Sequence, residues 1–178
     1  GPEIIEKTLE ILGSKARWVL YAPPARFAAL SDMAEIIAPE ALRALPGAPI
    51  ERLAIERSAA DLAAGAIDAV VTAPVSKSCF GGDFPGHTEL YAARLGVTDF
   101  AMMMTGPRLR VIPATTHVAL REVSGLLRTD ALVRIGRLAA RVLARDMGIV
   151  RPRIAYAGLN PHAGDGGLFG DEEARVIA

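Results

Sequence analysis

Short apolar runs of strand length alternate with segments of helical periodicity along most of this chain, and this alternation constrains the fold more than any other feature. Continuous apolar runs bounded by turn residues favour buried strands, whereas apolar residues recurring every three or four positions favour helices. Strands that alternate with helices predict an α/β fold with a largely parallel sheet. The runs that favour strands cover residues 18–22, 67–73, 100–105, 109–114 and 154–157.

Four segments have the apolar spacing of helices, and each is followed by a glycine that suits a helix end. These segments cover residues 2–12, 56–64, 87–95 and 129–147. We expect Thr129 to cap the last of them, because a threonine side chain can accept a hydrogen bond from a first-turn amide. The Ala-rich stretch 25–50, with three prolines, has no pattern that assigns it to a helix or a strand.

Both ends of the chain resemble interior positions of a longer protein. The chain opens without a methionine and ends inside a helix expected to begin near Gly170. At the usual domain sizes, we expect about 150 further residues in the natural protein. We expect residues 1–84 to be part of a first α/β domain and residues 85–178 to be part of a second one, which carries most of the motifs described below.

Composition excludes several classes of protein. Basic and acidic residues number 20 each, so the chain lacks the basic excess that a nucleic-acid surface requires. Its single cysteine, Cys79, cannot form an internal disulfide, which favours a reducing, cytoplasmic setting. No apolar run approaches the length that spans a membrane. Hydrophobic residues make up 51% of the chain, enough for a globular core.

The chain contains three histidines, and two of them follow predicted strands directly. His117 ends the sequence Thr-Thr-His after the strand at 109–114, and His162 lies in Asn-Pro-His-Ala-Gly after the strand at 154–157. A third polar motif, Val-Ser-Lys ending at Lys77, follows the strand at 67–73. Ligands of open α/β sheets bind outside the carboxyl ends of the strands. These motifs therefore indicate one site at that edge.

Each polar residue has a structural interpretation beside the functional one. His117 and His162 suit a borderline divalent metal, yet a single loop histidine is more often solvated or bonded to backbone. Gly86, His87 and Thr88 begin a predicted helix, where amide groups and the helix dipole favour an anion, but Thr88 alone would explain a helix cap. Lys77 could neutralise the charge of a phosphate, but a lysine after a strand is more often simply solvated.

The order of these motifs resembles that of the 4-hydroxythreonine-4-phosphate dehydrogenase family of vitamin B6 biosynthesis. The motifs are VTAPVSK at 71–77, GHTE at 86–89, LRV at 109–111 with TTH at 115–117, and GLNPHAG at 158–164. The resemblance covers nearly the whole chain. It implies a fold like that of the isocitrate and isopropylmalate dehydrogenases, with two α/β domains, a cleft between them and a homodimer.

The resemblance also implies a chemistry. Enzymes of this family use NAD and a divalent metal, such as zinc, magnesium or cobalt, to oxidise and decarboxylate 4-phosphooxy-L-threonine. His117 and His162 match two of the three metal histidines, and the third belongs to a motif beyond residue 178. His87 and Thr88 match positions that contact the phosphorylated substrate. The catalytic base and the NAD contacts match no residue of this chain, and no Gly-x-Gly-x-x-Gly follows a predicted strand.

Three alternatives fit the same motifs. Sister dehydrogenases oxidise D-threonate or D-erythronate 4-phosphate, and a related branch oxidises carboxylated cyclohexadiene diols. A non-catalytic small-molecule-binding protein that kept the fold and lost the metal is the alternative from another class.

Overall fold

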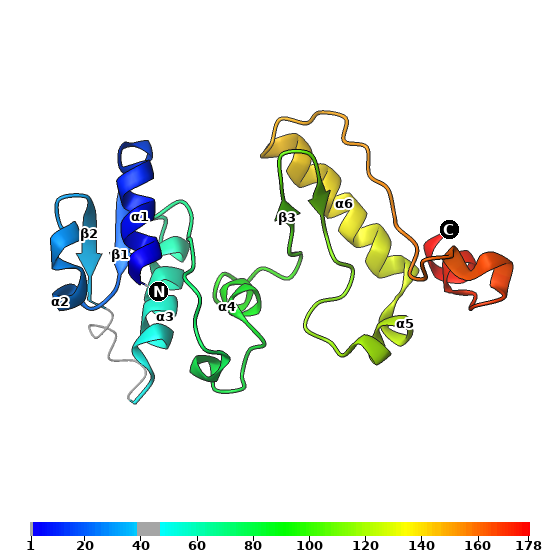
Figure 1. Cartoon of the computed structure of the whole chain (residues 1–178), viewed down its shortest axis with the longest axis horizontal. Coiled ribbons are helices and arrows are strands. Elements are labelled where there is room, and N and C mark those ends of the chain that lie inside the picture. The colour runs from blue at the N-terminus through cyan, green and yellow to red at the C-terminus, as the bar shows by residue number, and fades with distance from the viewer. Residues whose placement is uncertain (1, 39–46) are drawn as a thin grey trace. The chain divides into compact units, whose positions relative to one another are not determined.

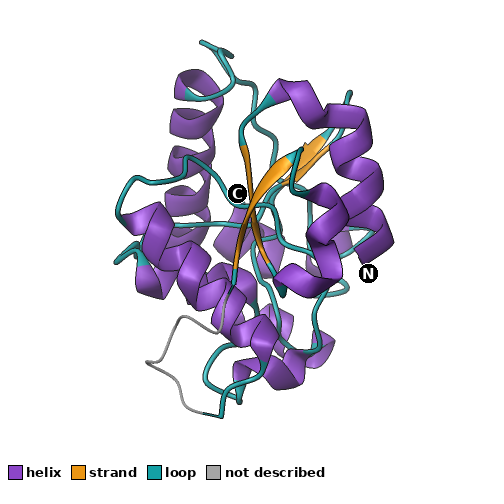
Figure 2. Cartoon of the chain, turned by 90° about the vertical axis from the view of Figure 1, so that its left-hand side faces the viewer, coloured by secondary structure: helices purple, strands orange, loops and turns teal. Residues whose placement is uncertain are grey.

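The computed structural model describes residues 2–38 and 47–178 and divides the chain into two compact units, Gly1–Thr98 and Asp99–Ala178. Each unit is described by itself. Figure 1 labels the elements, and Figure 2 shows that helices and loops make up most of the chain, with strands forming a small part of it. The mixture of helices and strands confirms the α/β class. The domain boundary at 84 and the likeness to isocitrate dehydrogenase stay predictions.

The first unit begins with a small layered motif. Helix α1 (Pro2–Leu12) and the turn η1 (Gly13–Lys15) lead into strand β1 (Trp18–Tyr21). Helix α2 (Pro24–Phe27) and the turn η2 (Ala28–Leu30) then lead into strand β2 (Ala34–Ile37). The two strands are parallel, with Trp18 opposite Ala34 and Tyr21 opposite Ile37. A parallel pair needs a crossover of about a dozen residues, and the α2–η2 segment supplies it.

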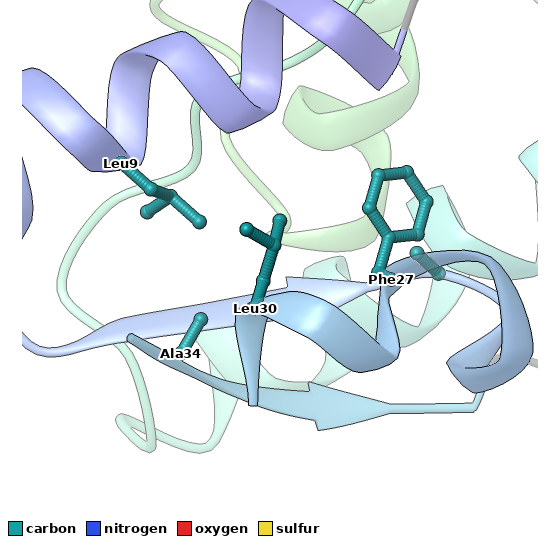
Figure 3. Close-up of a cluster of buried hydrophobic side chains, with 5 residues drawn as sticks. Leu9, Phe27, Leu30 and Ala34 are labelled. Carbon is teal, nitrogen blue, oxygen red and sulfur yellow. The ribbon is translucent and has the colours of Figure 1, made fainter. Parts of the chain in front are cut away.

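A cluster of buried apolar side chains joins α1 to this strand pair. Leu9 of α1, Phe27 of α2, Leu30 of η2 and Ala34 of β2 are all buried, together with Ala22. Figure 3 shows Leu9, Leu30 and Phe27 in the space between α1 and the strands. Burying a large apolar side chain contributes roughly 1.5–3 kcal/mol, so this cluster stabilises the start of the unit.

The rest of the first unit positions the GHTE motif. Helix α3 (Ile50–Ala63) is followed by an irregular segment, the turn η4 (Lys77–Phe80) and helix α4 (His87–Arg94). A second core forms where these three elements meet. It contains the buried side chains of Ile55, Cys79, Phe80 and Leu90. Because Leu90 of α4 is fully buried in this core, the start of α4 is fixed against α3 and η4.

The second unit is built around one long helix. A two-residue antiparallel pair, β3 (Met104–Thr105) with β4 (Arg110–Val111), precedes the turn η5 (Leu120–Glu122) and the short helix α5 (Val123–Leu126). Helix α6 (Thr129–Arg145) buries Leu132, Ile135 and Ala139, which are spaced three and four residues apart. The turns η6 (Ala163–Gly167) and η7 (Glu173–Ile177, π-helical) end the chain.

The helix predictions are confirmed with small shifts at their ends. Helices at 2–12, 87–94 and 129–145 lie where the spacing predicts them. The predicted helix 56–64 overlaps α3, which begins six residues earlier at Ile50 and ends at Ala63. Thr129 is not the cap of α6, because Arg128 occupies that position without a side-chain cap. The Thr129 hydroxyl instead donates to the carbonyl of Val176 at 2.9 Å and joins α6 to η7.

Most strand predictions are wrong in length or in kind. Strand 18–22 is confirmed as β1, but 100–105 and 109–114 shorten to the two-residue strands β3 and β4. Residues 67–73 and 154–157 form no strand with any described part of the chain. The sheet is not largely parallel, since one described pair is parallel and the other antiparallel. A strand forms only where a neighbour accepts its backbone hydrogen bonds, and these apolar runs have none here.

One strand was not predicted. β2 lies in the Ala-rich stretch 25–50 that has no clear pattern, and the short helix α2 begins one residue before that stretch. Part of that stretch, residues 39–46, falls outside the described residues.

Candidate functional site

The GHTE motif forms the start of helix α4, as predicted. Gly86 is the N-cap, and it has no side-chain acceptor for a cap hydrogen bond. Thr88 lies one residue inside the helix, so the interpretation of Thr88 as a simple cap is wrong. The amide N–H groups of His87 and Thr88 have no acceptor within the helix, because the ladder begins with Leu90 donating to Gly86 at 3.3 Å. This turn can therefore donate to an anion.

His87 is half-buried, and its ring packs against an aromatic neighbour. The edge of one ring meets the face of the other in the His87–Phe80 pair, with centroids 5.2 Å apart and planes 83° apart. Burial lowers the pKa of His87 below its ordinary value. The imidazole is therefore neutral at pH 7 and would contact a phosphate as a hydrogen-bond donor, without adding a charge.

The Val-Ser-Lys motif leads into the turn η4 next to this helix. Ser76 is its N-cap and accepts from the amide of Ser78 at 3.4 Å. Lys77 begins the turn and is exposed, so its ammonium is accessible to an anionic ligand. The buried Cys79 belongs to the core below it, and burial raises the pKa of its thiol. Cys79 is therefore a structural residue of this turn.

The Asn-Pro-His-Ala-Gly motif forms a tight turn, which hydrogen bonds to Asn160 stabilise. The Asn160 side-chain oxygen accepts from the amide of His162 at 3.0 Å, and the Asn160 carbonyl accepts from the amide of Ala163 at 2.8 Å. Gly164 has φ +74°, and a Cβ there would lie 2.7 Å from the Gly170 carbonyl. The turn therefore requires glycine at 164, and it leaves the His162 side chain exposed.

Glu173 fixes this turn from outside, a role that the sequence reasoning missed. Its Oε1 accepts from the amide of Asn160 at 2.7 Å. Its Oε2 is buried and accepts no hydrogen bond from the part of the chain that the structure describes. A carboxylate thirteen residues from its partner leaves no local signal of such a contact.

His117 lies in a different loop of the same unit and has a left-handed backbone, with φ +58°. This conformation is uncommon outside glycine and disfavours bulky or branched side chains. The His117 side chain is exposed. Such backbone outliers cluster at functional sites, which is consistent with a ligand role.

The donor chemistry of His117 and His162 fits a divalent metal, but the set is incomplete. Across residues 2–38 and 47–178, no group of three His, Cys, Asp or Glu side chains could hold a metal ion. Structural and catalytic zinc sites use at least three protein ligands. The described residues therefore do not form a complete metal centre by themselves. His87 and Thr88 lie in the first unit, whereas His117 and His162 lie in the second.

Comparison with known proteins gives a consistent family. A sequence model described as "Pyridoxal phosphate biosynthetic protein PdxA" matches residues 28–178. The 4-hydroxythreonine-4-phosphate dehydrogenase of Desulfosudis oleivorans is 52% identical over 124 residues, covering 67% of this chain and 37% of the relative. The D-threonate 4-phosphate dehydrogenase of Salmonella typhimurium is 44% identical over 116 residues, covering 64% of this chain and 35% of the relative.

The fold comparison agrees. The crystal structure of 4-hydroxythreonine-4-phosphate dehydrogenase from Klebsiella pneumoniae matches with a TM-score of 0.64 and 36% identity. The match covers 82% of this chain and 47% of that protein. The chain thus spans about half the length, or less, of these relatives. Because the family model matches most of the chain, including all four motifs, the chain belongs to the PdxA family of pyridoxal phosphate biosynthetic proteins.

Proposed function

We propose that the protein containing this chain is an NAD-dependent dehydrogenase that oxidises 4-phosphooxy-L-threonine in pyridoxal 5'-phosphate biosynthesis. Family membership across residues 28–178 is the observation that carries this proposal. The relatives' names supply the reaction, and the motifs of this chain supply residues with suitable chemistry. We expect the active protein to be a homodimer in the cytoplasm, with no nucleic-acid or membrane partner. Within the described residues, no helix is long and apolar enough to cross a membrane.

The phosphate end of the substrate is assigned to the start of α4. The amides of His87 and Thr88 would donate to phosphate oxygens, and the helix dipole favours the negative charge there. The neutral His87 ring would add one more hydrogen bond. Hydrogen bonds to a charged group contribute roughly 1.5–3 kcal/mol each, so this anchor selects a phosphorylated acid over its unphosphorylated analogue.

The chemistry at the other end is an oxidation followed by a decarboxylation. The hydride on the carbinol carbon passes to the nicotinamide ring of NAD⁺, and the hydroxyl proton passes to a base. The product is a β-keto acid. Its bond to the carboxyl carbon then breaks, carbon dioxide leaves, and the electron pair forms an enol that takes up a proton. Neither the base nor the nicotinamide site is assigned to a residue of this chain.

We further propose that His117 and His162 supply two ligands of a divalent metal, such as zinc, magnesium or cobalt, whose third ligand lies outside this chain. When bound, such an ion acts as a Lewis acid towards substrate oxygens. The hydrogen-bonded Asn-Pro-His turn and the left-handed backbone at His117 support this assignment, because each is a defined backbone conformation that carries an exposed imidazole.

A second substrate class is favoured by a specific observation. The Salmonella relative, 44% identical over 116 residues, acts on D-threonate 4-phosphate according to its name. This substrate shares the phosphate and the hydroxy acid, so the α4 anchor would serve both. D-Erythronate 4-phosphate and a cyclohexadiene diol carboxylate are further candidates, and the latter lacks the phosphate that the anchor requires.

One panel assay separates these possibilities. The complete natural protein is incubated with NAD⁺, a divalent metal and each acid in turn, and NADH formation is followed by absorbance. The expected result is the highest kcat/KM with 4-phosphooxy-L-threonine. A higher kcat/KM with D-threonate 4-phosphate would show that the protein is a D-threonate 4-phosphate dehydrogenase instead. Binding without turnover of any acid would instead support the non-catalytic alternative.

Two substitutions test the anchor and the metal ligands separately. His87→Ala should raise KM for the phosphorylated acid by roughly tenfold, the effect of losing about 1.4 kcal/mol of binding. His117→Ala and His162→Ala should each lower the bound metal measured by elemental analysis of the purified protein. His117→Asn is the matched control for the backbone, because asparagine tolerates the left-handed conformation. Unchanged metal content in both alanine variants would remove the metal assignment.

A further inference from the structure

Three charged side chains form a cluster between α3 and α4, which we name the Glu56 cluster: the buried Arg52 and Glu56, and Arg94, whose side chain is 42% exposed. Arg52 and Glu56 are 7% and 8% exposed. Glu56 Oε1 accepts from Arg52 Nε at 2.9 Å, and Glu56 Oε2 accepts from Arg94 Nε at 2.6 Å. Arg94 Nη2 also donates to Oε1 at 2.8 Å. One carboxylate therefore holds two guanidinium groups from different helices.

The cluster also holds the segment that connects η4 to α4. Arg52 Nη1 donates to the backbone carbonyl of Phe80 at 3.1 Å, in a buried hydrogen bond. Both guanidinium groups lie over the ring of Phe84, with Arg52 at 5.5 Å and Arg94 at 5.6 Å from its centre. Residues 80 and 84 lie on either side of the exposed glycines 81 and 82, so the cluster fixes a segment that would otherwise have few constraints.

The same contacts lead directly to His87. Phe80 is 2% exposed, and the centroid of its ring lies 5.2 Å from that of the His87 ring. Phe80 therefore accepts the hydrogen bond from Arg52 through its backbone carbonyl and contacts His87 through its ring. Arg94 lies seven residues after His87 on α4, close to two helical turns, so both lie on one face of the helix. The cluster therefore fixes α4 at its last residue through Arg94 and at its first residue through Phe80.

A second side-chain hydrogen bond joins α4 to α3. The hydroxyls of Ser58 and Tyr91 are 2.6 Å apart and join the middle of the two helices. This hydrogen bond lies at the middle of α4, away from His87. The contacts that can determine the direction of the His87 ring are therefore those of the Glu56 cluster and Phe80. Hydrogen-bonded ion pairs are directional, whereas apolar contacts such as those of Leu90 are not.

We propose that the Glu56 cluster is a positioning device that sets the direction of the His87 imidazole at the phosphate-binding start of α4. This inference rests on the proposed function, because His87 is assigned there to the substrate phosphate. Arg52, Glu56 and Arg94 act through Phe80 and the helix, and none of them contacts the substrate. A buried ion pair contributes little net stability compared with apolar residues, which is consistent with a role in placing a side chain.

The central test compares two substitutions on the same helix in the complete natural protein. Glu56→Gln keeps the shape of the side chain but removes the charge that holds both arginines. Arg57→Gln is the matched control, because it breaks the other i,i+4 ion pair of α3, to Asp61, which does not reach η4 or α4. Glu56→Gln should raise KM for the phosphorylated acid about tenfold, with kcat changed less than about twofold. Arg57→Gln should change neither.

A spectroscopic readout makes the test independent of turnover. The His87 ring protons lie beside the Phe80 ring and should show a ring-current shift in the proton NMR spectrum, assigned by its loss in His87→Gln. Glu56→Gln should move these resonances and Arg57→Gln should not. Arg52→Ala should move them as well, and Arg52→Lys should restore them in part, because lysine can still donate to the Phe80 carbonyl.

The outcomes are distinct. If Glu56→Gln and Arg57→Gln leave the His87 resonances and KM equally unchanged, the cluster is only structural and the proposal fails. If Glu56→Gln does not fold, Phe80→Leu takes its place: it keeps the cluster, removes the ring contact and should raise KM in the same way, and an unchanged KM would refute the proposal. If the wild type turns over no phosphorylated acid, the proposed function fails while the NMR comparison still decides whether the cluster sets the His87 ring.

Discussion

Tyr156 and Gly136 offer a test in which one substitution should have opposite effects in two backgrounds. The Tyr156 hydroxyl donates to the carbonyl of Leu132 in α6 at 2.9 Å. It lies directly over Gly136, and a Cβ at position 136 would overlap the hydroxyl oxygen. The contact joins α6 to residues 153–158, which lead into the Asn-Pro-His turn. Gly136→Ala should therefore displace Tyr156 from α6.

The expected magnitude follows from three contributions. Alanine is better than glycine inside a helix by about 1 kcal/mol. Displacing the Tyr156 hydroxyl removes a hydrogen bond of about 1 kcal/mol. Moving the half-exposed ring away from the helix loses roughly another 1 kcal/mol of apolar burial. Gly136→Ala should therefore destabilise α6 by about 1 kcal/mol in the wild-type background, as the two losses exceed the gain.

Removing the hydroxyl should reverse the sign. In Tyr156→Phe, the nearest ring atom to the new Cβ is the Cζ carbon at 3.2 Å, so the ring needs to yield by only a few tenths of an ångström. The helix propensity of alanine then dominates, and Gly136→Ala should stabilise α6 by roughly 0.5–1 kcal/mol. The coupling energy between the two positions should be about 1.5–2 kcal/mol.

Native-state hydrogen exchange of the α6 amides is the appropriate assay, because it reports the local free energy of opening without assuming that the whole protein unfolds in two states. The double-mutant cycle compares the wild type, each single variant and the double variant. An increase in stability of equal size in both backgrounds would show that Tyr156 does not lie over Gly136, and the reasoning would be refuted.

Three further predictions concern the core below α4. Leu90→Ala should lower the free energy of unfolding by about 3–4 kcal/mol and Leu90→Met by less than about 1.5 kcal/mol, measured by urea denaturation, because Leu90 is fully buried; equal losses would contradict this. Cys79 should react slowly with a thiol reagent until urea exposes it, since burial raises the pKa of its thiol, and fast labelling of the native protein would count against that burial. The Arg94 hydrogen bond lowers the pKa of Glu56, so its contribution to stability is present above the ordinary carboxyl pKa and is lost as pH falls through the lowered value. In Glu56→Gln, the free energy of unfolding should therefore decrease less steeply as the pH falls. An unchanged dependence on pH would exclude this contribution of Glu56.

Sequence reasoning succeeded where the determining contacts are local. The spacing of Leu132, Ile135 and Ala139 predicts α6 because the helix makes its own hydrogen bonds and needs only one apolar face. Gly86 before His87 likewise predicts the start of α4 from adjacent residues. The free amides of that first turn follow from helix geometry alone, so their position was predictable, while anion binding there stays a prediction.

The failures share the opposite property. Residues 154–157 have the composition of a strand, but a strand requires a partner that no local pattern supplies. The Arg94–Glu56 pair joins residues 38 positions apart, and Glu173 reaches Asn160 across 13 positions. Nothing in the neighbourhood of either acid distinguishes it from a solvated one. Only the i,i+4 spacing of Arg52 and Glu56 gave a signal, and that spacing is common on exposed helices.

The left-handed backbone at His117 has a consequence for how this sequence can change over generations. A glycine would adopt φ +58° without the steric cost of a side chain, roughly 1 kcal/mol. The backbone conformation alone therefore favours His117→Gly, while selection for metal binding would oppose it. A library of position-117 variants, sorted once for abundance in cells and once for metal content, should rank glycine high in the first sort and low in the second. Histidine would then persist at this position only in lineages that still use the imidazole.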